Sequence, residues 1–173
     1  MKTKERYPEK FVSESEACLR AFLEQCFGSC EKTTLEAAGQ EYFASNINFR
    51  GTISGQLVLV ASSQFADSFH PLREDAGGLS KKQLQDWIGE LANECLGSLK
   101  ASIEKFGIEI ELGLPASTHV EDFFAGDYSG ESWSCFRYSL SGSQFFFYLR
   151  ADGVGSCDFS KTIETNEDDS FIF

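Results

Sequence analysis

The chain has 173 residues, of which 42% are hydrophobic and 24% charged, an ordinary balance for a folded protein with room for one sizeable core. Its formal net charge of -12 at pH 7 argues against nonspecific nucleic-acid binding and against docking on an anionic membrane, because few cations are available to neutralise phosphates. The charge fits a protein that meets a partner with exposed Lys or Arg side chains.

Membrane insertion is also not expected. Residues 1–10 are charged and lack the apolar run of a signal peptide. The longest apolar stretches, 57–61 and 145–149, are far too short for a membrane-spanning helix. The sequence therefore predicts a cytoplasmic protein with no membrane partner.

The chain contains six cysteines but only two histidines and no CxxC pair. Without a secretory signal a disulfide framework is not expected, and a zinc site lacks ligands at the usual spacing. We interpret the cysteines as buried or half-buried thiols. They are Cys18, Cys26, Cys30, Cys95, Cys135 and Cys157.

The N-terminal third predicts a helix followed by strands. Ser13 or Ser15 can cap a helix that runs to about Phe27, with Gly28 just past its end. The segments that follow are separated by glycines, and the last two are rich in β-branched, aromatic or aliphatic residues. We interpret three of them as strands, at 30–38, 41–50 and 52–62.

A short helix is expected next, from Ser62 or Ser63 to about His70. It should stop there because Pro71 disfavours helical backbone at the residue before it. The paired glycines near the end of 74–78 predict a loop.

The segment 80–107 predicts one long amphipathic helix. Ser80 and Gln83 have the spacing of a capping box, and Gly107 supplies the C-terminal stop. Between them, apolar residues recur at helical spacing. They are Leu84, Trp87, Ile88, Leu91, Cys95, Leu99, Ile103 and Phe106.

Further strands are expected after the long helix. The segment 108–112 alternates apolar and acidic residues, as a half-buried strand does. The segments 133–140 and 144–150 flank a short glycine-containing turn and predict a hairpin.

We therefore predict an α+β fold with two similar helix-plus-strands halves. About six strands would form a mixed or antiparallel sheet with the helices packed on one side. The many phenylalanines, 17 in all, favour an aromatic core between sheet and helices. We assign residues 1–155 to a single domain and residues 156–173 to an acidic C-terminal tail.

One face of the long helix carries the candidate site. Asp86, Glu90 and Asn93 stand at i, i+4 and i+7, within about 60° of one another and opposite the apolar sector. Gly97 follows one turn later on the same stripe. Asn in a helix interior is less favourable than Lys, Glu or Gln, and Gly costs about 1 kcal/mol against Ala. These choices indicate a face shaped for a partner.

An ordinary solvated face is the competing interpretation. Every amphipathic helix needs a polar side, and Asp, Glu and Asn are usual occupants of it. Taken alone, the pattern favours this interpretation.

The segment 86–93, Asp-Trp-Ile-Gly-Glu-Leu-Ala-Asn, resembles the Asp/Ser-x3-Glu-x2-Asn signature of the CheC/CheX/FliY family of chemotaxis phosphatases. In that family a proline follows the helix, and Pro115 stands one residue closer than the family spacing. The segment 49–57 is similar to the hairpin that precedes the family's helices. The resemblance covers about residues 11–150.

Within that family the chain resembles the CheX branch. Ser13, Ala17 and Arg20 in the first helix have the spacing of a second signature, but Ala and Arg cannot stand in for Glu and Asn. CheC-like members often carry two sites, whereas CheX-like members carry one, on the helix of the second half.

The resemblance implies a protein aspartyl-phosphate phosphatase, a hydrolase acting on the phospho-aspartate of a CheY-type response regulator in chemotaxis or two-component signalling. Asn93 would orient the attacking water, and Glu90 would pair with the regulator's active-site lysine. Asp86 would add polar contacts, and Gly97 would leave space for the regulator.

The same resemblance implies the cofactors and the assembly. No metal would be bound by this chain, because the regulator holds the divalent metal. Members of the branch form homodimers through their sheets, and the aromatic hairpin strands, 133–140 and 144–150, are candidates for the dimer edge.

Three alternatives remain. The first is a non-catalytic receiver-domain binding module with the same face. The second is a flagellar-switch-like structural protein, which would not need the Glu90–Asn93 pair. The third is an unrelated enzyme using Cys95 and His119, which the position of Cys95 on the apolar face disfavours.

Overall fold

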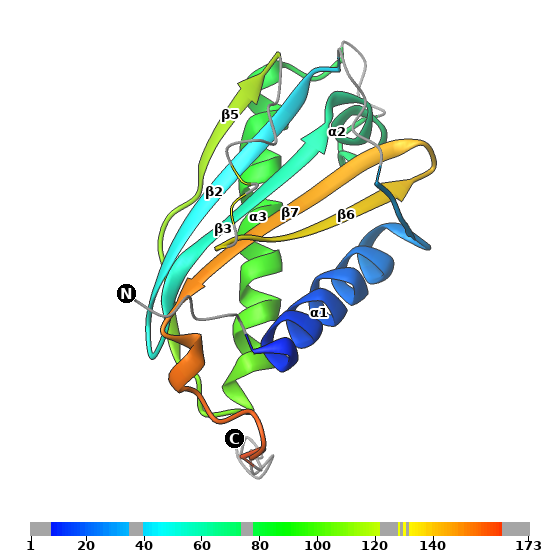
Figure 1. Cartoon of the computed structure of the whole chain (residues 1–173). Coiled ribbons are helices and arrows are strands. Elements are labelled where there is room, and N and C mark those ends of the chain that lie inside the picture. The colour runs from blue at the N-terminus through cyan, green and yellow to red at the C-terminus, as the bar shows by residue number, and fades with distance from the viewer. Residues whose placement is uncertain are drawn as a thin grey trace, which may run out of the picture.

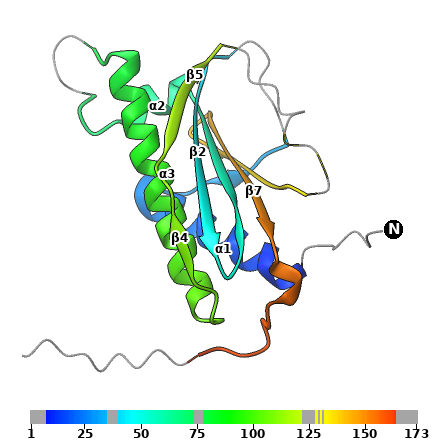
Figure 2. The same ribbon diagram turned by 90° about the vertical axis from the view of Figure 1, so that its left-hand side faces the viewer.

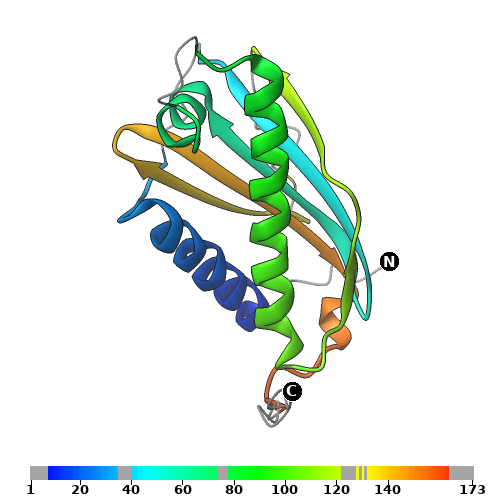
Figure 3. The same ribbon diagram turned by 180° about the vertical axis from the view of Figure 1, so that it is seen from behind.

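The computed structural model describes residues 8–34, 40–73, 78–121, 128, 130 and 132–163. These residues form a seven-stranded antiparallel sheet with the helices on one face, so the predicted α+β class is confirmed (Figures 1 and 3). The elements, in chain order, are α1 (Glu9–Phe27), β1 (Glu31–Lys32), β2 (Tyr42–Gly51), β3 (Ser54–Ser62), α2 (Ser63–Phe69), α3 (Lys81–Glu104), β4 (Ile110–Leu112), β5 (Ala116–Val120), β6 (Ser134–Leu140), β7 (Ser143–Asp152) and the 3-10 turn η2 (Val154–Ser156).

The strands are ordered β1-β6-β7-β3-β2-β4, and β5 also pairs with β2. The predicted hairpin is confirmed, with a turn at Ser141 and Gly142 between β6 and β7. The suggestion that both hairpin strands supply an edge is wrong for β7, which lies between β6 and β3. Only β6 is near an edge, and β1 covers it at Ser139 and Tyr138. The homodimer itself stays a prediction.

Two elements begin or extend differently from the sequence expectation. Helix α1 begins at Glu9, one turn before Ser13, because the Pro8 carbonyl accepts the Phe11 backbone N–H at 2.9 Å. The strand expected at 30–38 is reduced to the two residues of β1, and residues 35–39 lie outside the described part.

Strand β5 was not predicted. Its sequence, Ala-Ser-Thr-His-Val, is exposed or half-buried and has no clear alternation of apolar and polar residues. It forms because its backbone continues the pairing of β2, from Tyr42 opposite Val120 to Asn46 opposite Ala116. An edge strand of this kind is specified by its neighbour more than by its own residues.

Phe65 of α2 is the centre of the aromatic packing that positions α3. Its side chain is fully buried, and its ring centroid lies 4.9 Å from that of Phe145 and 5.1 Å from that of Phe27. Trp87 of α3 stacks on Phe65 at 5.9 Å, with an angle of 12° between the rings. The contact joins the sheet, α1 and the N-terminal half of α3 in one cluster.

The opposite end of α3 is held by α1 and by the segment after β7. Glu14 of α1 accepts a hydrogen bond from Lys105 Nζ at 2.7 Å, and hydrogen bonds from Lys10 and Lys105 lower the pKa of Glu14. The chain after η2 passes beneath this end of α3 (Figure 2), where the Ile163 N–H donates to the Lys105 carbonyl at 2.6 Å. The acidic residues 164–169 lie outside the described part.

Candidate functional site

The start of α3 is fixed by the predicted capping box. Ser80 Oγ accepts the Gln83 backbone N–H at 3.2 Å, and Gln83 Oε1 accepts the Ser80 backbone N–H at 2.9 Å. Two of the backbone donors at the helix start are thereby satisfied, so the helix begins at one defined residue.

The buried face of α3 fixes its rotation against the sheet and α1. Of the eight predicted apolar positions, Trp87 and Phe106 are half-buried, whereas the other six are at most 5% exposed. They are Leu84, Ile88, Leu91, Cys95, Leu99 and Ile103. Since these side chains face the core, the stripe of Asp86, Glu90 and Asn93 must face away from it.

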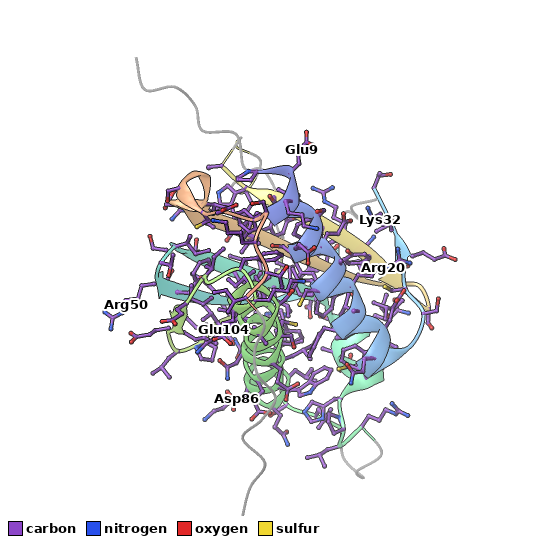
Figure 4. The ribbon with its side chains drawn as sticks, turned by 90° about the horizontal axis from the view of Figure 1, so that it is seen from below. Glu9, Arg20, Lys32, Arg50, Asp86 and Glu104 are labelled. Carbon is purple, nitrogen blue, oxygen red and sulfur yellow. The ribbon has the colours of Figure 1, made fainter. Side chains whose placement is uncertain are left out.

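All three residues of the stripe are exposed, as their spacing predicts. Figure 4 shows Asp86 projecting from α3 on the side away from the sheet. Glu90 and Asn93 are three residues apart, which places their Cβ atoms about 5–6 Å from each other on one face. The two side chains can therefore contact one small group between them.

Within the described residues, neither a hydrogen bond nor an ion pair engages the side chains of Asp86, Glu90 or Asn93. Elsewhere on α3, Glu104 pairs with Lys100 at 3.7 Å, so acidic side chains on this helix do find partners where a cation is in reach. The stripe presents unpaired polar groups to an external ligand.

Gly89, between Asp86 and Glu90, brings the β4–β5 connection against the stripe. Gly89 is buried, and a Cβ built on it would lie 2.7 Å from Ser117 Oγ and 3.6 Å from Pro115 Cβ. Pro115 therefore sits beside the signature residues, although it is distant in sequence. The sequence shows Gly89 only as part of the motif and does not predict this contact, for which the small size of glycine is the one available signal.

Gly97 has a different environment. A Cβ built there would meet no atom within 4 Å among the described residues, so the packing of this chain does not require glycine. A glycine that its own fold does not need, on a stripe of unpaired polar groups, leaves room for a partner's backbone to approach.

Replacement by alanine should have opposite effects on stability at Gly97 and at Gly89. Gly97→Ala should raise the free energy of unfolding by about 0.5–1 kcal/mol, because alanine is the better helix former. Gly89→Ala should lower it by about 1 kcal/mol, because overpacking against Ser117 exceeds the gain in helix propensity. Urea denaturation measures both.

Ser117 provides the control for this pair. Its hydroxyl donates to buried Ser45 Oγ at 3.0 Å, so it cannot turn aside without losing that bond. Adding Ser117→Ala to Gly89→Ala removes the clashing oxygen and should restore part of the lost stability. A destabilised Gly97→Ala protein would contradict the open space at that position.

Comparison with known proteins decides the family. Residues 43–134, slightly more than half of the chain, match the protein family described as chemotaxis phosphatase CheX. The chain belongs to the CheX family. The matched region includes all but the first residue of β2, the whole of β3, α2 and α3, and the signature from Asp86 to Asn93. No curated protein matches the sequence.

Solved structures share the CheX-family fold. The chemotaxis protein CheX from Vibrio vulnificus has a TM-score of 0.67 and 18% identity, covering 87% of this chain and 100% of that one. A CheC-like superfamily protein from Shewanella sp. PV-4 has a TM-score of 0.66 and 15% identity, covering 84% and 99%. The CheX–CheY–BeF3–Mg2+ complex from Borrelia burgdorferi matches with a TM-score of 0.58 and 12% identity, covering 82% and 97%.

The alternative of an enzyme using cysteine and histidine finds no support in this CheX-family fold. Burial raises the pKa of Cys95 well above its ordinary value, so its thiol stays protonated and unreactive. His119 Nε2 lies 3.1 Å from Glu41 Oε2, and its ring packs on Phe43. All six cysteines are free thiols, and the expectation that they are buried or half-buried is wrong for Cys26 and Cys135, which are exposed.

The described residues contain no group of three or more His, Cys, Asp or Glu side chains arranged to hold a metal ion. They also contain no helix that is long and apolar enough to cross a membrane.

Proposed function

We propose that this CheX-family protein accelerates hydrolysis of the phospho-aspartate of a CheY-type response regulator. The observation that carries the proposal is the exposed stripe of Asp86, Glu90 and Asn93, which bears the family signature and has no partner among the described residues. A relative of the same fold, from Borrelia burgdorferi, forms a complex with CheY, which supports a receiver domain as the class of partner.

Hydrolysis of the phospho-aspartate requires few catalytic groups from the phosphatase. In the hydrolysis a water oxygen bonds to phosphorus while the bond between phosphorus and the aspartate oxygen breaks, which returns a carboxylate and inorganic phosphate. The acyl phosphate is already activated, and in our proposal the receiver, not this chain, holds the divalent metal. What remains is to aim the water in line and to exclude other solvent.

Asn93 is the residue proposed to aim the water. A carboxamide both donates and accepts hydrogen bonds, so it can hold a water by its hydrogen and by its oxygen at once. A carboxylate at this position could only accept, and it would repel the phosphoryl oxygens. Asn93 is exposed in the middle of a rigid helix, so it can enter the receiver's site without a loop rearrangement.

Glu90 is proposed to anchor the receiver through the lysine of the receiver's active site. The carboxylate is exposed and unpaired within the described residues, and in the docked complex it gains a cation in a desolvated setting. Asp86, one turn earlier, adds a second acidic contact. Gly97, one turn after Asn93, leaves the space that the receiver's loops need.

The test is multiple-turnover phosphate release. Purified protein at a tenth or so of the concentration of a phosphorylated receiver from the same cell should accelerate phosphate loss until all receiver is dephosphorylated. Saturable binding without acceleration would refute catalysis and favour the non-catalytic binding module. The predicted homodimer can be measured on the same sample by sedimentation.

A further inference from the structure

A three-residue bulge between β4 and β5 carries Leu114, a large apolar side chain that is almost fully exposed. Strand β2 pairs with β4 through Phe49–Gly51 and with β5 through Tyr42–Asn46, which leaves Gly113, Leu114 and Pro115 as a bulge on the sheet edge. The Gly113 N–H donates to the Asn48 carbonyl at 2.8 Å, and a Cβ on Gly113 would lie 2.9 Å from that oxygen. The bulge is therefore held close against β2.

Leu114 is 91% exposed at the tip of this bulge. Single exposed leucines are ordinary on protein surfaces, and Leu72 at 51% and Ile163 at 55% are further large apolar side chains exposed in the described part. Leu114 differs in that it contributes almost no burial to its own fold while its backbone is fixed on both sides. Burying such a side chain in a partner costs little conformational entropy of the backbone.

The bulge lies beside the stripe of Asp86, Glu90 and Asn93. Pro115 Cβ is 3.6 Å from the position of a Cβ on Gly89, which directly precedes Glu90. Bond geometry then puts the Leu114 Cα within about 9 Å of that position. A protein interface of ordinary size buries about 800 Å² per partner, a patch with a radius of about 16 Å. A receiver centred on Glu90 therefore extends as far as the bulge that carries Leu114.

We infer that Leu114 is the apolar anchor for docking of the receiver, an inference that rests on the function proposed above. The stripe offers charged and polar groups, which align a partner but give modest net affinity because they must be desolvated. A rigid apolar side chain at the side of the stripe supplies affinity from burial. The fitting partner presents an apolar hollow beside the lysine that Glu90 contacts. Leu114 does not touch the reacting atoms, so it is a positioning residue.

The test is Leu114→Ser with steady-state kinetics and a direct binding measurement. The Kd for the unphosphorylated receiver and the KM for the phosphorylated receiver should both rise about tenfold or more, because the burial of one leucine is lost. The value of kcat should stay within about twofold of the wild type. Leu114→Met, which keeps the apolar volume, should retain most of the affinity.

Ile163→Ser is the matched control, because Ile163 is also exposed but lies against Gly107 at the far end of α3. It should leave Kd and KM unchanged. Equal effects of both variants, or an unchanged Kd in Leu114→Ser, would overturn the anchor. These outcomes can be told apart from a failure of the proposed function. The Kd measurement tests Leu114 even if the wild-type protein releases no phosphate. If Asn93→Ala loses activity while Leu114→Ser keeps the wild-type Kd and KM, the anchor alone is refuted.

Discussion

Replacing Asn93 by alanine should lower the rate of receiver dephosphorylation by about a hundredfold while the Kd for the receiver changes about twofold or less. The helix is unaffected, because Asn93 is exposed, makes no hydrogen bond within the described residues and is replaced by a better helix former. What is lost is the group that aims the water. Single-turnover phosphate release at saturating phosphatase separates this loss from any change in binding.

Asn93→Asp and Glu90→Ala complete the experiment. Asp has the shape of Asn but cannot donate, so it should also fail to hold the water. Glu90→Ala should raise the Kd as well as lower the rate, since the proposed role of Glu90 is to pair with the receiver's lysine. Normal turnover in Asn93→Ala would contradict the assignment of Asn93, and a normal Kd in Glu90→Ala would contradict the lysine contact.

The sequence predicts α3 well because all of its determinants are local. The Ser80–Gln83 box, the apolar period and the glycine at 107 lie within one segment, and each has a known meaning for a helix. The structure bears out the capping box and the period of buried residues, but α3 ends at Glu104, and Gly107, with a φ of 74°, lies in the turn that follows. The exposure of Asp86, Glu90 and Asn93 follows from the same periodicity.

The contacts that complete the site are not local, so the sequence does not predict them. Gly89 meets Pro115 and Ser117 because β5 pairs with β2, and β5 carries no strand pattern of its own. The exposure of Leu114 depends on the same pairing. A residue whose environment is set by a strand from elsewhere in the chain is visible only in the fold.

Orientation of the stripe depends on packing at the other side of α3, and Phe65→Ala should show this dependence. The fully buried ring touches Phe27, Phe145 and Trp87, so its removal leaves a cavity at the junction of α1, the sheet and α3. We expect the free energy of unfolding to fall by about 3–5 kcal/mol. Urea denaturation with an unchanged m-value measures this loss.

Phe65→Met is the control, since a side chain of similar volume should cost about 1.5 kcal/mol or less. A loss below 1 kcal/mol or so in Phe65→Ala would mean that the neighbouring rings collapse into the space. The consequence for function comes through Trp87, which is adjacent to Asp86 and loses its stacking partner. Because Asn93 must be aimed to within a fraction of an ångström, even the folded fraction of Phe65→Ala should dephosphorylate the receiver more slowly than Phe65→Met. Equal rates per folded molecule would show that α3 keeps its orientation without the aromatic cluster.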